Sequence, residues 1–239
     1  MKKPLLYDCK RIEELCRRDR FEEYLAVYKE KSPFSGPSVY FYERMMEYHE
    51  NLFSIHDILH DECALDTLYA LLTAWGLHRM GKTAVKLRAY DDFKNSLQYQ
   101  GHVDILKKWE GHSLINLSDE KFGSFLTDAW SLINSLKIGE SVGKRLVPNS
   151  KVLHNLWPDL VPPVDTTYTL VFFFGTGAYK SEDQNEIFQH ILKGYRKIAT
   201  STELNDVFNR EGIETGIGYG ITKRIDNAII GWVLKNINQ

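Results

Sequence analysis

The sequence has few features that would suit a membrane or an oxidising environment. Three cysteines occur in 239 residues. Cys9 and Cys16 are two helical turns apart and Cys63 is isolated, which favours reduced thiols over a disulfide framework. No run approaches the roughly 18 apolar residues of a membrane-spanning helix, and the first residues, MKKPLLYDCKRIEEL, lack the apolar core of a signal peptide. We therefore expect a cytoplasmic protein with no membrane partner.

The sequence also has no surplus of charge of one sign. Thirty Lys+Arg against 32 Asp+Glu give a formal net charge of −2, so any nucleic-acid-binding surface would have to be a local patch. The hydrophobic content of 43% is typical of a folded globular protein. No change of composition marks a linker, so we treat residues 1–239 as one domain.

Apolar residues spaced three and four apart predict helices along most of the chain. Ser118 is the expected cap of a helix that opens at Asp119, and a break is expected near Gly101. No internal repeat is visible, and we predict an all-α fold of roughly ten helices. The predicted helical segments are 10–31, from 38 onward, 51–77, 86–111, from 119 onward, 181–200 and 222–236.

Residues 76–83, GLHRMGKT, match the phosphate-loop pattern G-x-x-x-x-G-K-[ST]. That loop needs a preceding buried strand, and small residues whose amides can wrap a phosphate. In this sequence a helical pattern leads into the motif and bulky side chains fill it. We favour a helix end with a cationic rim, and we expect no nucleotide cofactor.

His56 and His60 are four residues apart, a spacing that places two imidazoles on one helix face. They could hold a metal with Cys63 or Asp57 as a third ligand. A metal site usually needs a second cluster of ligands, and the other histidines form no matching pair. We therefore expect no bound metal.

Glycines 212, 216, 218 and 220 precede Lys223 and Arg224 at the start of the last predicted helix. Backbone amides at a helix start, beside two cations, could bind a DNA phosphate. The alternative is a tight turn between helices, which glycine permits. Lys223 and Arg224, together with Lys144 and Arg145, are the candidate nucleic-acid contacts.

The segment 147–175, VPNSKVLHNLWPDLVPPVDTTYTLVFFFG, concentrates the remaining candidates. If Asn149 or Ser150 caps a helix starting at Lys151, then His154 shares a face with this lysine. The prolines at 158, 162 and 163 force an extended return. Asp165 follows as an acceptor at the start of another element, for which residues 167–174 fit either a helix or a buried strand.

The runs Ser150-Lys151-Val152-Leu153 and Val161-Pro162-Pro163-Val164-Asp165 resemble the second hairpin helix and the catalytic aspartate of the helix-hairpin-helix DNA glycosylases, the 8-oxoguanine glycosylase branch in particular. The resemblance is close only within the segment 147–175. It implies an all-α fold of two lobes packed around this segment, with double-stranded DNA bound at the cleft. It also implies that the hairpin corresponds to residues 146–150.

The resemblance assigns chemistry to two side chains. Lys151 matches the lysine that attacks the sugar carbon, which requires a deprotonated amine in a desolvated or cationic setting. Asp165 matches the aspartate that stabilises positive charge on the sugar as the base leaves. The target base must first be flipped from the duplex. His154, Asn149 and Ser150 are then expected to contact the substrate.

Three functional hypotheses remain open from the sequence. The first is a DNA glycosylase or lyase for damaged or modified bases, acting through Lys151 and Asp165. The second is a non-catalytic protein of the same fold that binds nucleic acid or another partner through its four basic candidates. In the third, Lys151 is a solvated residue and Asp165 a plain helix cap worth about 1 kcal/mol.

Overall fold

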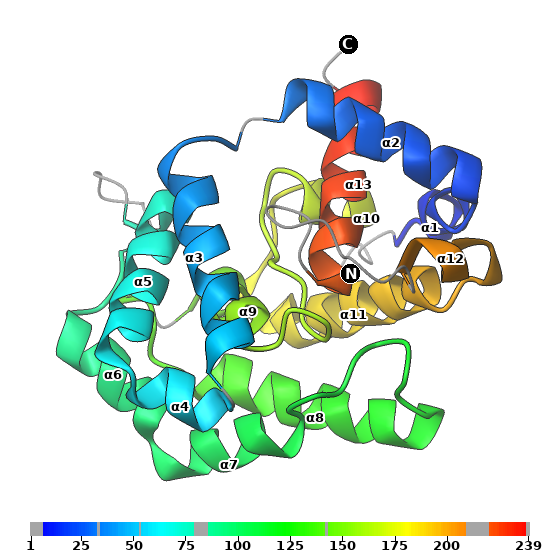
Figure 1. Cartoon of the computed structure of the whole chain (residues 1–239). Helices are drawn as coiled ribbons and strands as arrows, with labels where there is room; N and C mark the ends of the chain where they lie inside the picture. Colours follow the sequence, from blue (N-terminus) through cyan, green and yellow to red (C-terminus); the bar gives the residue numbers. More distant parts are fainter. Residues whose placement is uncertain are drawn as a thin grey trace.

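A computed structural model of the chain describes residues 7–32, 34–52, 54–78, 86–141, 143–208 and 220–237. Within these ranges the protein is all-α (Figure 1), and the only β pairing is an isolated antiparallel bridge between Leu87 and Gly139. The α-helices are α1 (Cys9–Leu15), α2 (Arg18–Lys31), α3 (Pro37–Asn51), α4 (Ile55–His60), α5 (Glu62–Leu72), α6 (Tyr90–Gln98), α7 (Gln100–Lys108), α8 (Asp119–Ser135), α9 (Leu146–Leu156), α10 (Thr169–Phe174), α11 (Gln184–Ala199), α12 (Asn205–Phe208) and α13 (Ile221–Asn236). A π-helical turn spans Thr73–Leu77, and 3₁₀ turns span Ser181–Asp183 and Thr202–Leu204.

Helices from the two ends of the chain pack against each other. α2 and α13 lie side by side (Figure 1), and α1, α10 and α11 join them. The backbones of α2 and α13 approach closely at Gly231, where an added Cβ would lie 1.9 Å from the carbonyl oxygen of Tyr24. Glycine is required at this position because any side chain would separate the two helices.

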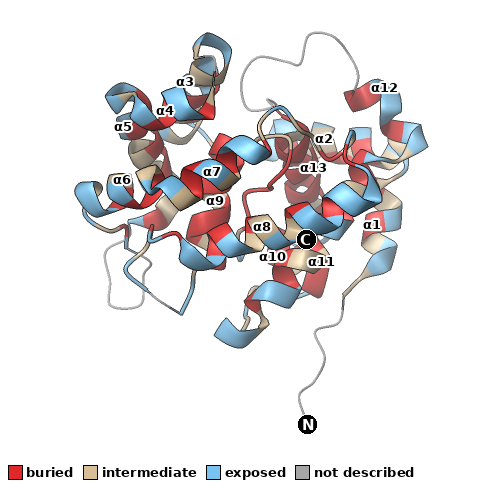
Figure 2. Ribbon diagram, turned by 90° about the horizontal axis from the view of Figure 1, so that it is seen from below, coloured by how far each residue is buried: buried red, intermediate tan, exposed pale blue. Residues whose placement is uncertain are grey.

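The middle of the chain forms a second group of packed helices. α3, α4, α5, α6, α7 and α8 contact one another, and α9 packs against α5 and α8. α8 also contacts α11 of the first group. One apolar cluster runs through both groups, and the buried faces of these helices point inward while their outer faces are exposed (Figure 2). The segment that follows α9 therefore lies where the two groups meet.

Most of the helical segments expected from the sequence are confirmed. Ser118 caps α8 by accepting a hydrogen bond from the Lys121 amide at 3.3 Å. The break expected near Gly101 occurs at Tyr99, between α6 and α7. Residues 167–174 were open to two interpretations, and the structure places Thr169–Phe174 in a helix. Burial of Phe172 and Phe173 outweighs the strand propensity of this aromatic run.

The prediction that Asn149 or Ser150 caps a helix starting at Lys151 is wrong. α9 begins at Leu146, because a proline is tolerated in the first turn, where its missing N–H would have had no helical partner. Asn149 and Ser150 are buried inside this turn. The connection between α8 and α9 is consequently residues 136–145, which contain two glycines.

Two sequence motifs lie partly or wholly outside the described residues. Residues 79–83 of the phosphate-loop match lie outside the described residues, but the part before them confirms a helical lead-in, with α5 running into the π-helical turn. Of the glycine-rich run 211–220 only Gly220 is described, and an added Cβ there would lie 2.8 Å from the carbonyl oxygen of Pro158. No helix of the described chain is long and apolar enough to cross a membrane. The three cysteines are free thiols.

Candidate functional site

Lys151 lies on α9, half-buried, and reaches the π-helical turn of the second group. Its Nζ donates a hydrogen bond to the carbonyl oxygen of Trp75 at 2.9 Å, and it lies 5.8 Å from the centroid of the Trp75 ring. Trp75 and Gly76 depart from helical geometry, with φ of 79° at the glycine. Backbone carbonyls at such a break lose their regular helical partners and can accept from a side chain. The π-helical turn therefore anchors the Lys151 amine.

A second lysine amine lies against the same indole ring. Lys223 Nζ is 5.8 Å from the centroid of Trp75 and 5.3 Å from that of Phe34, distances typical of cation–π contacts. It also lies 2.5 Å from Oδ2 of Asp226, and the two side chains are only 5% and 3% exposed. Trp75 thus separates a partly accessible amine from one that is buried in an ion pair.

The charge state of Lys223 follows from its carboxylate partner. Burial lowers the pKa of Lys223, but Asp226 raises it above its ordinary value, with smaller contributions in the same direction from Tyr28 and Asp165. Lys223 is therefore a cation in the interior of the protein. An ion in this position is stable only with a nearby opposite charge.

Asp165 lies in the turn that leads into α10. Its Oδ1 accepts hydrogen bonds from the backbone amides of Thr167 at 2.7 Å and Tyr168 at 2.6 Å. The expectation of an acceptor at the start of a helix is confirmed, although the amides belong to the turn before α10. The backbone amides of the turn therefore hold the carboxylate in place.

Lys151 and Asp165 reach the same buried ion pair. Burial raises the pKa of the Asp226 carboxyl, Lys223 lowers it, Asp165 raises it and Lys151 lowers it. Each of these charges must lie within electrostatic range of Asp226 to have this effect. The four residues Lys151, Asp165, Lys223 and Asp226 are here called the charge cluster.

His154 is buried next to the aromatic residues that adjoin the charge cluster. Its Nδ1 lies 2.9 Å from the carbonyl oxygen of Val161 and 3.1 Å from Oγ1 of Thr222, and its Nε2 lies 3.3 Å from the hydroxyl of Tyr42. Complete burial lowers the pKa of His154 to about 3, so the imidazole is neutral. The ring of Tyr42 stacks on both His154 and Trp75. His154 is thus a core residue that orients the aromatic wall of the cluster.

A small aromatic cavity opens beside the charge cluster. Phe34, Tyr42 and Trp75 supply its rings, and Lys223 supplies its charged group; Ser38 and Val39 complete the lining. α3 positions Tyr42, the π-helical turn positions Trp75, and α13 positions Lys223. The sequence could not group these residues, because they come from three elements that meet only in the folded chain.

Asn149 and Ser150 hold the scaffold together beneath the cluster. Nδ2 of Asn149 donates to the carbonyl oxygens of Ile133 at 2.7 Å and Leu136 at 2.9 Å, at the end of α8. Oγ of Ser150 accepts from the amide of Val164 at 3.2 Å. Both side chains are committed to contacts between elements, so they fix the position of α9 beside the segment that carries Asp165.

The four basic candidates divide between two settings. Lys144 is exposed and Arg145 half-buried, directly before α9. Lys223, expected as a nucleic-acid contact, is buried, and the half-buried Arg224 donates to the carbonyl oxygen of Val207. Lys144 is therefore the candidate placed to meet a partner from solvent without a rearrangement.

The connection 136–145, here called the hairpin, links α8 to α9, so residues 146–150 lie inside α9 and not in a turn before it. The amide of Arg88 donates to the carbonyl oxygen of Ile138, and the amide of Glu140 donates to that of Lys86, both at 2.9 Å. The first amides of α9, those of Arg145 and Leu146, donate to Oε1 of Gln184 on α11, both at 2.9 Å. The hairpin is thus held at both ends, and Gln184 satisfies the helix start.

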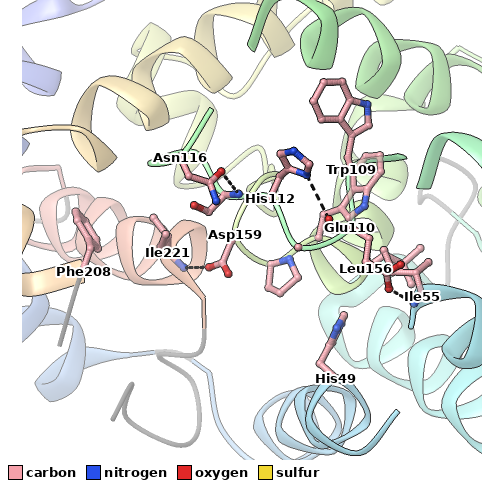
Figure 3. A pocket seen from close by; sticks show the side chains of 14 residues that line it. His49, Ile55, Trp109, Glu110, His112, Asn116, Leu156, Asp159, Phe208 and Ile221 are labelled. Carbon is pink, nitrogen blue, oxygen red and sulfur yellow. Dashed lines mark hydrogen bonds between the residues drawn. The ribbon is translucent and has the colours of Figure 1, made fainter. Parts of the chain in front are cut away.

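A larger cavity of about 420 Å³ lies between α3, the loop after α7 and the start of α13 (Figure 3). His49, Glu110, His112 and Asp159 are its titratable residues. Burial lowers the pKa of His49 and raises that of Asp159. Oδ1 of Asp159 accepts from the amide of Ile221 at 2.7 Å and so fixes the start of α13.

No cluster of three or more metal-ligating side chains occurs among the described residues. His56 and His60 do share a face of α4, with ring centroids 4.1 Å apart. Nδ1 of His60 is 2.8 Å from the carbonyl oxygen of His56. The pair is therefore engaged within its own helix.

Comparison with known proteins yields no relative. No protein-family model, curated protein or solved structure matches the chain.

Proposed function

We propose that the protein is a DNA glycosylase or lyase that acts on damaged or modified bases, with Lys151 as nucleophile and Asp165 as its electrostatic partner. The observation that carries the proposal is the hydrogen bond from the Val164 amide to Ser150 Oγ at 3.2 Å, which holds the residue before Asp165 against the residue before Lys151. The two candidates are 14 positions apart in the sequence, and the extended return between them brings both to the junction of the helix groups.

The proposed reaction uses the two side chains in different ways. Lys151 first loses a proton to solvent, and its neutral amine then donates an electron pair to the sugar carbon C1′ as the bond from C1′ to the base breaks. The base leaves with the bonding electrons and takes up a proton. The Asp165 carboxylate stabilises the positive charge that develops on the sugar. A proton then passes from the Lys151 nitrogen to the ring oxygen O4′ as the bond between C1′ and O4′ breaks, which leaves a protonated Schiff base on Lys151.

The arrangement of helices also supports a two-lobed glycosylase-like fold. The terminal helices form one group and the middle helices another, and the charge cluster lies where they meet. We propose α8, the hairpin 136–145 and α9 as the counterpart of the family's helix–hairpin–helix unit, with Gly139 and Gly143 in the hairpin. Glycines in this position would let backbone amides come close to a DNA phosphate. Lys144 is exposed at its end and would contact the backbone of double-stranded DNA.

The aromatic cavity has a volume of about 10 Å³, too small for a base, so a base that has left the duplex could enter only if Tyr42 moved off Trp75. The rings of Trp75 and Phe34 would then stack on a planar heterocycle, and Lys223 would offer a hydrogen-bond donor to a carbonyl oxygen on its edge. The cavity adjoins both Lys151 and Lys223 through Trp75. A base in this position would leave its sugar near the Lys151 amine.

One observation favours a second candidate function, a nucleic-acid-binding protein without catalysis. The Lys151 amine donates to the Trp75 carbonyl, and an amine used this way is not aimed at a substrate. Under the catalytic proposal, substrate binding must release this hydrogen bond. Under the alternative, Lys151 stays a structural link between α9 and the π-helical turn.

Borohydride trapping on duplexes with an abasic site or an oxidised base separates these functions. We expect a covalent adduct with the unmodified protein, none with Lys151→Ala, and an undiminished adduct with Lys107→Ala, an exposed lysine in the last turn of α7. Base release without an adduct would indicate a glycosylase without lyase chemistry. Salt-dependent duplex binding with neither product would favour the non-catalytic binder, and no binding at low salt would reject both.

Asp165→Asn tests the partner role without removing the turn. The amide oxygen can still accept from the backbone at 167 and 168, so the fold before α10 is retained while the charge is lost. We expect the single-turnover rate to fall by about 100-fold, in the range found when one electrostatic stabiliser is removed. An unchanged rate would leave Asp165 as a cap only.

A further inference from the structure

A groove of about 390 Å³ lies beside the hairpin, between α6, the start of α7 and the end of α8. We call it the Tyr99 groove. Arg88, Asn95, Tyr99, Ser135 and Lys137 line it, and Asp92 is the one acidic residue in its lining. Its size is in the range of small-ligand sites. None of these residues belongs to the charge cluster or to the aromatic cavity.

Tyr99 is an exposed aromatic side chain that is nevertheless held in place. It lies at the break between α6 and α7 and is 63% exposed. Its ring contacts His102 edge to face, with centroids 5.0 Å apart. An added Cβ at Gly101 would lie 2.9 Å from its Cε1, so the ring rests on the glycine backbone. A fixed ring that faces solvent can stack a planar group at little entropic cost.

A chain of hydrogen bonds connects the tyrosine side of the groove to its basic side. Nδ1 of the buried His102 lies 2.6 Å from the carbonyl oxygen of Ser96. Oγ of Ser96 accepts from the amide of Lys137 at 2.9 Å. The hairpin is therefore fixed to α6 at the backbone of Lys137. The fold thus sets the distance between the Tyr99 ring and the backbone of Lys137.

The basic side of the groove combines two cations. Lys137 is exposed, and Arg88 is half-buried, with Nε 3.4 Å from the carbonyl oxygen of Gly139 and Nη1 4.0 Å from the carboxylate of Asp92. Arg88 and Lys137 also line a smaller hollow that continues to Arg145, just before α9, and to Asn149 on α9. In a chain with net charge −2, this is a local positive surface.

We propose that the Tyr99 groove binds a nucleotide unit of a DNA strand, with its base stacked on Tyr99 and the adjoining phosphate on Lys137 and Arg88. An unpaired base has a face for the ring, and its edge lies within reach of polar groups such as the Asn95 amide. The basic residues Arg88, Lys137 and Arg145 extend from the groove to the start of α9. The identification of the strand as DNA rests on the proposed function, whereas the base-and-phosphate chemistry rests on the groove alone.

The test is binding of a fluorescent single-stranded thymidine 12-mer, followed by anisotropy over a range of salt concentrations. Because stacking of a base on an aromatic ring contributes to the binding free energy, Tyr99→Ala should weaken binding at least about fivefold. Tyr99→Phe retains the ring and should bind as the unmodified protein does. Gly101→Ala should act like Tyr99→Ala, because its methyl displaces the ring. Lys137→Ala should lower the slope of log affinity against log salt by about one.

Two matched variants control for loss of any exposed tyrosine or lysine. Tyr40→Ala removes a tyrosine that is 58% exposed on α3, and Lys107→Ala removes an exposed lysine at the other end of α7. Both should bind the oligonucleotide as the unmodified protein does. Unchanged binding by Tyr99→Ala, or equal losses in the controls, would overturn the groove as a contact. Equal competition by free thymidine monophosphate would overturn the strand as its occupant.

Failure of this proposal is distinguishable from failure of the proposed function. If Lys151 forms an adduct and Tyr99→Ala binds normally, only the groove is rejected. If no adduct or base release occurs but Tyr99→Ala loses oligonucleotide binding, the groove stands and the enzymatic proposal falls.

Discussion

The ammonium group of Lys223 lies 2.5 Å from the carboxylate of Asp226, three residues along the same face of α13, with both side chains almost completely removed from solvent. A buried pair gains strong attraction but loses the hydration of two ions. Such a pair contributes little net stability relative to apolar residues, yet neither partner can be removed alone. Its position beside Trp75 makes it the fixed element of the charge cluster.

Lys223→Met is expected to destabilise the protein by about 3–5 kcal/mol, because it leaves the Asp226 charge buried without its partner. The double variant Lys223→Met/Asp226→Leu should recover most of this loss, since no charge then remains to be compensated. Urea denaturation followed by circular dichroism measures both. Lys197→Ala, which removes an exposed partner of Glu13, should change stability by less than about 1 kcal/mol. Equal losses in the single and double Lys223 variants would contradict the account.

His154 predicts a loss of stability in mild acid. Its pKa is lowered to about 3 by burial, whereas an unfolded histidine has a pKa of about 6.5. Between these values the unfolded chain binds a proton that the folded chain does not, so the free energy of unfolding falls as the pH falls, by up to about 1.4 kcal/mol per pH unit. In His154→Gln, the fall in the free energy of unfolding between pH 7 and 5 should be smaller by about 2 kcal/mol.

The measurement is urea denaturation of both proteins across that pH range. His49, whose pKa is also lowered, is present in both and its effect cancels in the comparison. Parallel curves for the two proteins would mean that His154 is protonated as readily in the folded state as in the unfolded state.

The sequence predicted the helices well because their signals are local. Periodic apolar residues and the Ser118 cap depend on neighbours within a few positions, and the structure confirms them. The start of α9 was misplaced because Pro148 reads equally well as a turn or as a first-turn residue. What decides between these is Gln184, which caps α9 from a distance of 38 positions. No pattern near residue 146 could reveal this cap.

The candidate site was predictable only in part, for the same reason. Lys151 and Asp165 lie within one segment and could be paired from the sequence. Lys223 and Asp226 form an i, i+3 pair that reads as an ordinary exposed ion pair on a helix, and only the packing of α13 shows that it is buried. Trp75 lies at the site because it belongs to a π-helical turn, and such turns have no reliable sequence signal.

Asn149 provides a test of the junction between α8 and α9. Asn149→Ala removes both hydrogen bonds to the last carbonyls of α8 and leaves these acceptors buried. We expect a loss of about 2–4 kcal/mol in the free energy of unfolding, measured by urea denaturation. Asn134→Ala, at an exposed position on α8, should change it by less than about 0.5 kcal/mol. Similar small effects at both positions would show that the carbonyls find other partners.

Gly231 and Gly123 make opposite predictions for the same substitution. Both lie inside helices, where alanine is favoured over glycine by about 0.5–1 kcal/mol. At Gly123 nothing lies within 4 Å of an added Cβ, so Gly123→Ala should stabilise the protein by that amount and raise its Tm by about 1–4 °C.

At Gly231 the Cβ would meet the Tyr24 carbonyl oxygen at 1.9 Å and the Tyr28 amide nitrogen at 3.2 Å. These are backbone atoms of α2 and cannot rotate away. Gly231→Ala should therefore lower the free energy of unfolding by about 3 kcal/mol or more. The Tm should fall accordingly, as measured by calorimetry. Because α13 also carries Lys223, the strain should reach the charge cluster, and Lys151 adduct formation should fall in this variant but not in Gly123→Ala. A stable Gly231→Ala protein would mean that α2 and α13 are farther apart than the structure places them.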